Sequence, residues 1–370
     1  MVFEMEDIRN LRVILHENAE LSGCEVHTNR ILNDFLEGLS PDVHIRSIGG
    51  NGLAVVFRGD EPGRRVMVRG DIDALNIPEG ERSCSHRCGH DGHAAILAGL
   101  AARLSVRRPA KGEVVLLFQP AEETGQGARS VIASPEFQSI RPDIAFALHN
   151  IPGYEENTVL LRDECFAAAS LGLRLVFDGV TAHASQPETG HSPQHLLSAL
   201  LDIFWKKSEM LKEETPLTMM TVTHSVLGEP TFGVAPAHAE IWMTLRSFDN
   251  EKLTRLTADV VQLCTLVAER QGFRFSSSMH EAFPATMNDT HALDVVKAAA
   301  NSLNLKITPL DAPFRWSEDF GRFAEICPCA MFGVGCGTGH LPLHNPDYVF
   351  NDDIIETCID LFEKIIIFAQ

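Results

Sequence analysis

Cysteine and histidine side chains gather in one short stretch, SCSHRCGHDGHAA, which spans residues 83–95. Thiolates and imidazoles are ligands that zinc and related transition metals prefer. A structural zinc site needs four such ligands with paired spacing, and the pair Cys84 and Cys88 has no second pair of that kind. This absence disfavours a self-contained structural zinc site, and it leaves open which of these side chains hold a metal.

Acidic or imidazole side chains also follow four apolar segments that predict buried strands. These side chains are Asp71 and Asp73, Glu122 and Glu123, His149, and His344. In open α/β sheets, ligands bind beyond the carboxyl ends of the strands, so these groups are expected to converge. Taken singly, each has a plain alternative: a turn or helix cap for the aspartates, a solvated face for the glutamates and an ordinary strand-end histidine.

The elements that must position these groups follow from hydrophobic periodicity. In residues 1–166, short β-branched or aromatic runs bounded by Gly, Pro or Asp alternate with amphipathic segments. The first kind predicts buried strands and the second predicts helices, including one over residues 91–106 with Asp91 as its N-cap. Strands that alternate with helices predict an α/β fold with a mostly parallel central sheet.

The middle of the chain has a different pattern. Half-exposed strands and amphipathic helices follow one another in the order β-α-β-β-α-β, which is typical of a ferredoxin-like α+β sandwich. We place this inserted domain at residues 167–283, and assign residues 1–166 and 284–370 to one discontinuous catalytic domain. A four-stranded sheet of this kind leaves an edge strand available for pairing.

Composition excludes several classes of protein. Lys and Arg number 31 against 50 Asp and Glu, and the net charge of −19 disfavours nucleic acid and anionic membranes as partners. No segment has the roughly 20 apolar residues that a membrane span needs. The N-terminus is acidic and amphipathic, unlike a signal peptide, and the nine cysteines are scattered. We therefore expect a cytoplasmic protein with reduced thiols.

Several motifs together carry a family resemblance. They are RGDIDALNIPE, HRCGHDGHAAILAG, LFQPAEETGQGA, ALHNIPG, WSEDF and LPLHNPDYVFND. Their order and spacing resemble the di-metal aminoacylase and carboxypeptidase superfamily, in the branch of hippurate hydrolases and auxin–amino-acid conjugate hydrolases. The resemblance runs from Arg69 to Asp352 by motif. It implies a zinc-peptidase-like catalytic domain and an inserted dimerisation or lid domain through which the protein forms a homodimer.

The resemblance also implies a set of metal ligands. They fall on Cys88, His90, Glu123, His149 and His344. A thiolate, three imidazoles and a carboxylate suit two divalent transition-metal ions such as Zn, Mn, Co or Ni, and do not suit Mg or Ca. Two such ions would share a water and polarise a substrate carbonyl.

Further roles follow from the same resemblance. Glu122 matches the general base, and Asp73 matches the acid that orients a metal ligand. His183 in the inserted domain matches a histidine that hydrogen-bonds the developing oxyanion, with an ordinary loop histidine as the alternative. Arg246 matches an arginine that holds a substrate carboxylate, with a strand-surface arginine as the alternative. His86 and His93 lie in the motif but match no ligand, and His93 is expected to pack or hydrogen-bond in the core.

The chain departs from the branch pattern at several positions. Gly233 replaces an asparagine that helps to bind substrate in relatives, and Thr181 replaces a glycine before His183. Asn76 and Ser317 also differ from the usual residues. We expect the hydrolytic core to be preserved, and the recognition of the acyl or carboxylate group to differ.

The expected function is hydrolysis of the amide bond of small N-acyl or N-aroyl amino acids or short peptide-like conjugates. Two alternatives stay open. The same site could serve aryl-amine deamination or ureido hydrolysis, which the loss of asparagine at position 233 motivates. A non-catalytic ligand-binding relative is the third possibility, and the retention of Glu122 with all five ligands disfavours it.

Overall fold

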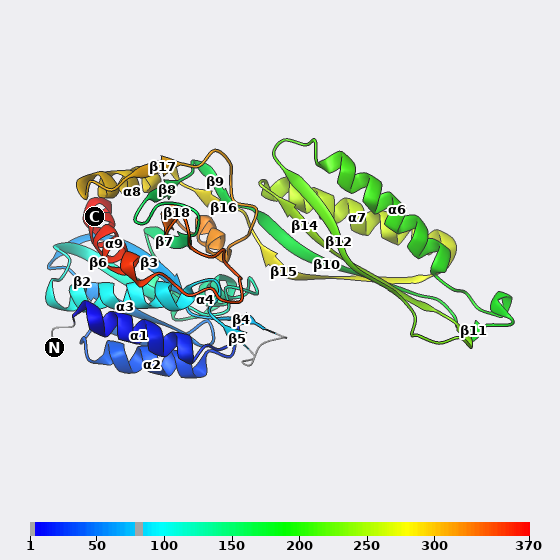
Figure 1. Ribbon diagram of the computed structural model, residues 1–370, viewed down its shortest axis with the longest axis horizontal. Helices are drawn as coiled ribbons and strands as arrows, with labels where there is room; N and C mark the ends of the chain where they lie inside the picture. Colours follow the sequence, from blue (N-terminus) through cyan, green and yellow to red (C-terminus); the bar gives the residue numbers. More distant parts are fainter. Residues whose placement is uncertain (1–3, 78–83) are drawn as a thin grey trace. The chain divides into compact units, whose positions relative to one another are not determined.

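The protein is described by a computed structural model that covers residues 4–77 and 84–370, and it forms two compact units (Figure 1). The first unit comprises the described residues up to 166, together with 286–313 and 318–370. The second comprises residues 167–285 and 314–317. The short segment 314–317 joins the second unit because the Ala168 amide donates to the carbonyls of Phe314 and Trp316, at 3.1 and 3.0 Å. No sequence pattern indicated that pairing.

An eight-stranded sheet forms the centre of the first unit, in the order β1-β2-β6-β3-β7-β18-β8-β17. Strands β6, β3, β7 and β18 run parallel to one another, whereas β1 pairs with β2 and β2 with β6 in antiparallel fashion. The strands are β1 (Val43–Ile48), β2 (Gly52–Arg58), β3 (Glu61–Asp71), β6 (Lys111–Gln119), β7 (Ile144–Ile151), β8 (Val159–Leu161), β17 (Ile307–Pro309) and β18 (Cys329–Gly335). This parallel centre confirms the predicted α/β class.

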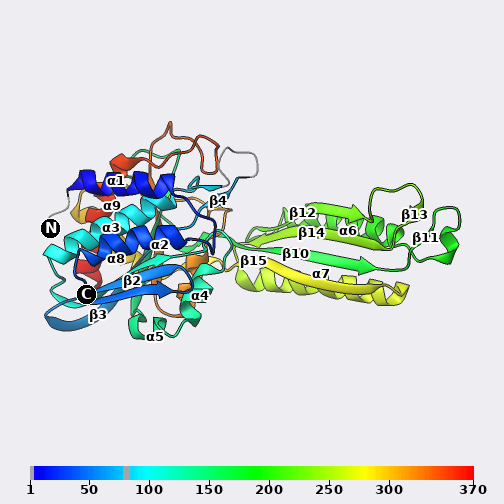
Figure 2. The same ribbon diagram turned by 90° about the horizontal axis from the view of Figure 1, so that it is seen from below.

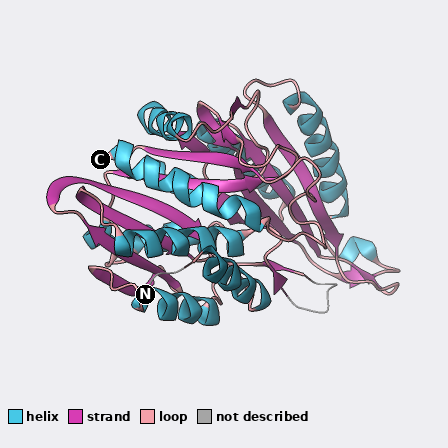
Figure 3. Cartoon of the chain, turned by 60° about the vertical axis from the view of Figure 1, so that its left-hand side comes forward, coloured by secondary structure: helices cyan, strands magenta, loops and turns pink. Residues whose placement is uncertain are grey.

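Helices cover the sheet of the first unit (Figures 2 and 3). The helices are α1 (Met5–Glu17), α2 (Val26–Glu37), α3 (His90–Val106), α4 (Gly127–Ala133), α5 (Phe137–Ile140), α8 (Thr290–Ser302) and α9 (Ile355–Ala369). Helix α3 is buried along most of its length, because α1, α2 and α9 pack beside it while it rests on β3. Strand β7 is buried at every residue, as expected of a parallel strand covered on both faces.

The second unit has the predicted β-α-β-β-α-β order. Its main elements are β10 (Ala169–Asp178), α6 (Gln194–Leu211), β12 (Thr218–Leu227), β14 (His238–Ser247), α7 (Asn250–Gln271) and β15 (Arg274–Phe283). The antiparallel sheet has the order β12-β14-β10-β15, so β12 is an edge strand. Ile241 and Met243 are buried while Trp242 is exposed, because α6 and α7 cover one face of the sheet.

Several short elements complete the chain. They are β4 (Leu75–Asn76), β5 (Cys84–Ser85), β9 (Glu164–Ala167), β11 (Ala182–His183), β13 (Val234–Ala235), β16 (Thr286–Asn288) and three 3₁₀ turns at Pro187–Thr189, Asp319–Glu325 and Asp352–Ile354. Strands β11 and β13 pair with each other. Among the helices that the structure describes, none is both long and apolar enough to cross a membrane.

Candidate metal centre and active site

The carboxyl ends of three neighbouring parallel strands supply the first part of the site. Strand β3 ends at Asp71 and leads to Asp73, β6 leads to the Glu122–Glu123 pair, and β7 carries His149 near its end. Because β6, β3 and β7 are adjacent and parallel, their carboxyl ends lie at one edge of the sheet. These groups therefore lie together, as the rule for the carboxyl ends of parallel strands predicted.

The tight start of α3 supplies the second part. Gly89 has φ of 93°, in the left-handed region, and a Cβ there would lie 2.8 Å from the side-chain amide of Asn150. Glycine meets both conditions without strain, and it lets Cys88 and His90 face the strand ends. Asp91 is not the N-cap, which corrects the prediction: the helix begins at His90 with Gly89 as N-cap. The carboxylate of Asp91 instead contacts the His16 ring at 2.8 Å.

All five expected ligands lie in one cluster. Donor atoms of Cys88, His90 and His149 lie within 4.8 Å of one another, and so do those of Cys88, Glu123 and His344. Cys88 belongs to both groups, and its Sγ lies 3.5 Å from Nε2 of His149. The two groups of candidate ligands are therefore joined through Cys88.

The donor atoms themselves fit a divalent transition metal. The buried atoms His90 Nε2 and Glu123 Oε1 lie 3.8 Å apart and have no hydrogen-bond partner among the residues that the structure describes. Burial, with a smaller contribution from the nearby Glu123, raises the pKa of the Cys88 thiol to about 12. Burial also raises the pKa of Glu123 to about 8. A cation would reverse these shifts and satisfy the unpaired donors.

Asp73 fixes the orientation of His90. The His90 ring presents Nδ1 to the main-chain oxygen of Asp73 at 3.0 Å and to its Oδ1 at 3.3 Å, which leaves Nε2 facing the cluster. The other carboxylate oxygen, Oδ2, accepts from the Ser22 hydroxyl at 2.6 Å and from the Glu123 amide at 3.0 Å. This is the arrangement expected of a residue that orients a ligand and does not bind metal itself.

Glu122 lies beside the cluster in a buried, acidic environment. Its Oε1 accepts a long hydrogen bond, 3.4 Å, from the main-chain amide of Asp319, and its carboxylate lies close to those of Glu318 and Asp319. Burial raises the pKa of Glu122 well above its ordinary value, and the charges of Glu318 and Glu123 add to this effect. A carboxyl group with a raised pKa can both accept and return a proton near neutral pH.

Arg69 is the cation that balances these acids. Its buried guanidinium bonds Asp71 at 2.5 Å, Glu318 at 2.8 Å and Asp319 at 3.0 Å, and its Nε donates to Gln119 at 3.0 Å. The motif SEDF was recognised from the sequence, but no role was predicted for its two acids. The structure places both beside the expected general base.

The other motif histidines have distinct surroundings. His93 contacts Asp71 through Nδ1 at 2.6 Å and Asn150 through Nε2 at 2.6 Å, which confirms that it hydrogen-bonds within the core. His86 is buried, and neither of its ring nitrogens has a partner among the described residues. Burial lowers the pKa of His86 to about 4, which keeps its ring neutral.

Three predicted site residues belong to the second unit. The exposed His183 contacts the Ser185 hydroxyl through Nδ1 at 2.7 Å and lies opposite Val234 in the β11–β13 pair. Gly233 accepts from the Ala184 amide at 3.1 Å, and a Cβ at this glycine would meet no atom within 4 Å. Arg246 donates to the main-chain oxygen of Arg315 and to the Ser317 hydroxyl. Their contacts with a substrate stay predictions.

The fold and the motif residues define a metal-dependent hydrolase of amide bonds. Residues 67–367 match the model of peptidase family M20/M25/M40, so the chain belongs to this family. The family resemblance inferred from the motifs is thereby confirmed.

Similar proteins span almost the whole chain. A hippurate hydrolase of Campylobacter jejuni is 28% identical over 375 residues, which are 98% of this chain and 95% of that protein. An N-acetyl-L-cysteine deacetylase of Bacillus subtilis is 28% identical over 96% of this chain and 86% of its own length. Among solved structures, a putative aminohydrolase from methicillin-resistant Staphylococcus aureus has a TM-score of 0.85 at 21% identity, covering 99% of this chain and 96% of that one. At that identity the likeness supports the fold.

Proposed function

We propose that this protein hydrolyses the amide bond of N-acyl or N-aroyl amino acids or of short peptide-like conjugates, using two divalent transition-metal ions. The observation that carries the proposal is the convergence of five side chains that could hold a metal beside a buried Glu122. The ligands would be Cys88, His90, Glu123, His149 and His344. The names of the relatives, a hippurate hydrolase and an N-acetyl-L-cysteine deacetylase, support an N-acyl amino acid as substrate.

Each step of the reaction then has a residue of this chain. When bound, the ions supply Lewis acidity that polarises the substrate carbonyl and acidifies water. Glu122 accepts the proton of the water that attacks the amide carbon and returns it to the leaving nitrogen. Asp73 keeps the His90 ring in one orientation. His183 donates a hydrogen bond to the developing oxyanion, and Arg246 binds the substrate carboxylate.

The test is a panel of N-acyl and N-aroyl amino acids assayed with added Mn, Zn or Co, with metal content measured in parallel. We expect one amino acid and one carboxylic acid as products. Glu122→Gln should keep the metal and lose about 10²–10⁴-fold in kcat. No turnover with any metal despite two bound ions, or full activity in Glu122→Gln, would refute the proposal. Release of ammonia would instead favour deamination or ureido hydrolysis, the alternative that Gly233 motivates.

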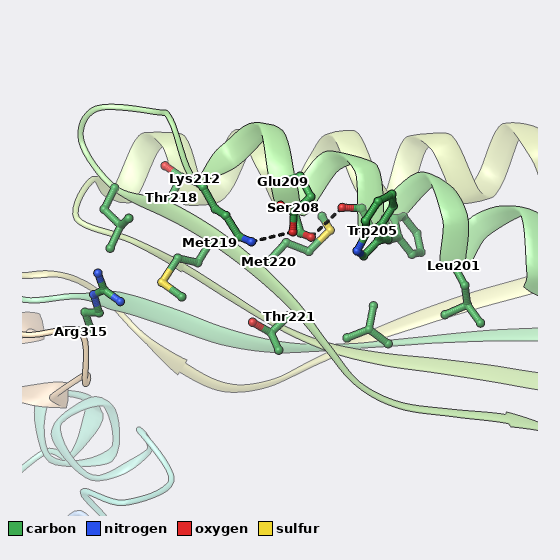
Figure 4. A pocket seen from close by; sticks show the side chains of 13 residues that line it. Leu201, Trp205, Ser208, Glu209, Lys212, Thr218, Met219, Met220, Thr221 and Arg315 are labelled. Atoms are coloured by element: carbon green, nitrogen blue, oxygen red, sulfur yellow. Dashed lines mark hydrogen bonds and ion pairs between the residues drawn. The ribbon is translucent and has the colours of Figure 1, made fainter.

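We also propose that the protein is a homodimer through the second unit. The edge strand β12 and helix α6 border a hollow of about 620 Å³ whose lining includes Trp205, Met219 and Met220 (Figure 4). Trp205 is 62% exposed, which is unusual for so large an apolar side chain. Sedimentation at micromolar concentration should give twice the monomer mass, and Trp205→Glu should give a monomer. A monomeric wild-type protein would contradict this part of the proposal.

A further inference from the structure

The turn between α1 and α2, residues 18–25, reaches the segment that carries Glu122. Glu25, at the end of this turn, is completely buried. One oxygen of its carboxylate accepts from the main-chain amides of Gly23 at 2.7 Å and Ala121 at 2.8 Å. The other oxygen accepts from the Asn51 side chain at 3.4 Å. Burying a carboxylate is unfavourable unless it is hydrogen-bonded, and these contacts compensate for the burial of Glu25.

Ala121 is the residue immediately before Glu122, and its backbone is strained. Its φ is 52°, in the left-handed region that non-glycine residues rarely adopt. Such a conformation persists only where the surrounding structure fixes it. The Ala121 carbonyl accepts from the Gly127 amide at 2.9 Å, and the Ala121 amide is held by Glu25. Both sides of this residue are thus anchored, and its conformation sets the direction of the Glu122 side chain.

The same turn also touches the residue that orients His90. The Ser22 hydroxyl donates to Asp73 at 2.6 Å, and the Ala74 amide donates to the Glu20 carbonyl at 2.9 Å. The turn is therefore fixed to the loop after β3 as well as to the loop after β6. The contacts with the loop after β3 do not involve Glu25, so a side-chain change at position 25 would leave them in place.

We propose that Glu25 is a positioning residue for the hydrolytic reaction: it holds the strained Ala121 backbone and thereby sets the position of the Glu122 carboxylate. This inference rests on the proposed function, because it assigns Glu25 a role through the proposed general base. Glu25 lies outside every motif that carried the family resemblance. An acid in a polar turn between two amphipathic helices is normally solvated, so the sequence alone gives no sign of this contact.

The first test compares three substitutions of Glu25. Glu25→Gln keeps an acceptor oxygen in place and should retain most of the wild-type kcat. Glu25→Ala leaves the Ala121 amide without its acceptor and should lower kcat about 10–100-fold with little change in KM, because small misplacements of a catalytic group have effects of this size. Glu25→Asp keeps the charge but withdraws the oxygen, so it should resemble Glu25→Ala. It also keeps the test decisive if Glu25→Ala does not fold.

A matched control comes from the same turn. Glu20 also accepts main-chain amides, those of His27 and Thr28 at 2.8 Å each, but these lie at the start of α2 and not beside Glu122. Glu20→Ala should lower the melting temperature and leave kcat unchanged. Equal loss of kcat in Glu20→Ala would show a general structural effect and would overturn the positioning role.

The decisive test is a double-mutant cycle between Glu25 and Ala121. Glycine adopts a positive φ without strain, so Ala121→Gly should make the loop less dependent on Glu25. We expect the fold-reduction in kcat caused by Glu25→Ala to be several-fold smaller in the Ala121→Gly background than in the wild type. Equal cost in both backgrounds overturns the inference. A normal kcat in Glu25→Ala, with Glu122→Gln inactive, overturns this inference alone, whereas an active Glu122→Gln overturns the proposed function itself.

Discussion

Replacing Arg69 tests how far the first unit depends on a single buried cation. The Arg69 side chain is fully buried and contacts three carboxylates, those of Asp71, Glu318 and Asp319. Arg69→Met has a similar length but removes the charge, which leaves these buried acids without their counter-ion. Removing one partner of a buried ion pair costs about 3–5 kcal/mol, so we expect a loss of free energy of unfolding in that range. Arg69→Lys keeps the charge but not the forked geometry, so its free energy of unfolding should lie between those of Arg69→Met and the wild type.

The distribution of tryptophan gives this experiment an internal control. All three tryptophans, at positions 205, 242 and 316, belong to the second unit, whereas Arg69 belongs to the first. Urea unfolding followed by far-UV circular dichroism should therefore show a first-unit transition at lower urea in Arg69→Met. The tryptophan-fluorescence transition should stay where it is in the wild type. A variant as stable as the wild type, or an equal shift in both signals, would refute the reasoning.

Three further predictions use the same signals. The hydrogen bond from Arg174 lowers the pKa of Glu240 to about 2, below the ordinary value of 4.5, so the unfolded state binds more protons between these values. The contribution of Glu240 to the stability of the second unit should be fully present above pH 4.5 and should be lost toward pH 2, as followed by tryptophan fluorescence. Glu240→Gln should abolish this pH dependence. Gly89→Ala should lower the free energy of unfolding by about 1–2 kcal/mol because of the left-handed backbone alone. It should also lose metal, because the new Cβ would collide with Asn150. Chelator should lower the melting temperature of the first unit but not the tryptophan transition, and a shift in both would contradict a metal site confined to the first unit.

The part of the site that the sequence predicted follows from local rules. Apolar runs that predict buried strands are followed by acids or by His149. Because the strands are parallel and adjacent, these side chains lie at one edge of the sheet. His344 was predicted as a ligand from the order of the motifs. It lies in a loop with φ of 67°, and hydrophobic periodicity could not have predicted its position. The prediction of Asp91 as the N-cap was wrong because the N-cap rule takes no account of Gly89, two residues earlier, whose left-handed backbone starts the helix at His90.

The residues that the sequence did not predict are those whose burial comes from tertiary packing. Ser22 and Glu25 lie in a polar turn, and nothing in their neighbours distinguishes them from a solvated loop. They become important only because the turn packs against the loops after β3 and β6. The segment 314–317 is similar, since its membership of the second unit depends on hydrogen bonds to a residue about 150 positions earlier.

The charge balance of the first unit connects these findings. Among the described residues, six carboxylates lie in or beside the cluster, at positions 71, 73, 122, 123, 318 and 319, and the Arg69 guanidinium contacts three of them. Such an excess of buried negative charge is unfavourable unless cations or protons compensate it. Arg69 neutralises the side of the cluster that faces Glu318. His90 Nε2 and Glu123 Oε1, which have no hydrogen-bond partner in the described part of the chain, face the expected metal position. The acidic cluster thus favours metal binding on one side. On the other side it adds to the effect of burial in raising the pKa of Glu122, so one charge distribution serves both requirements of the proposed reaction.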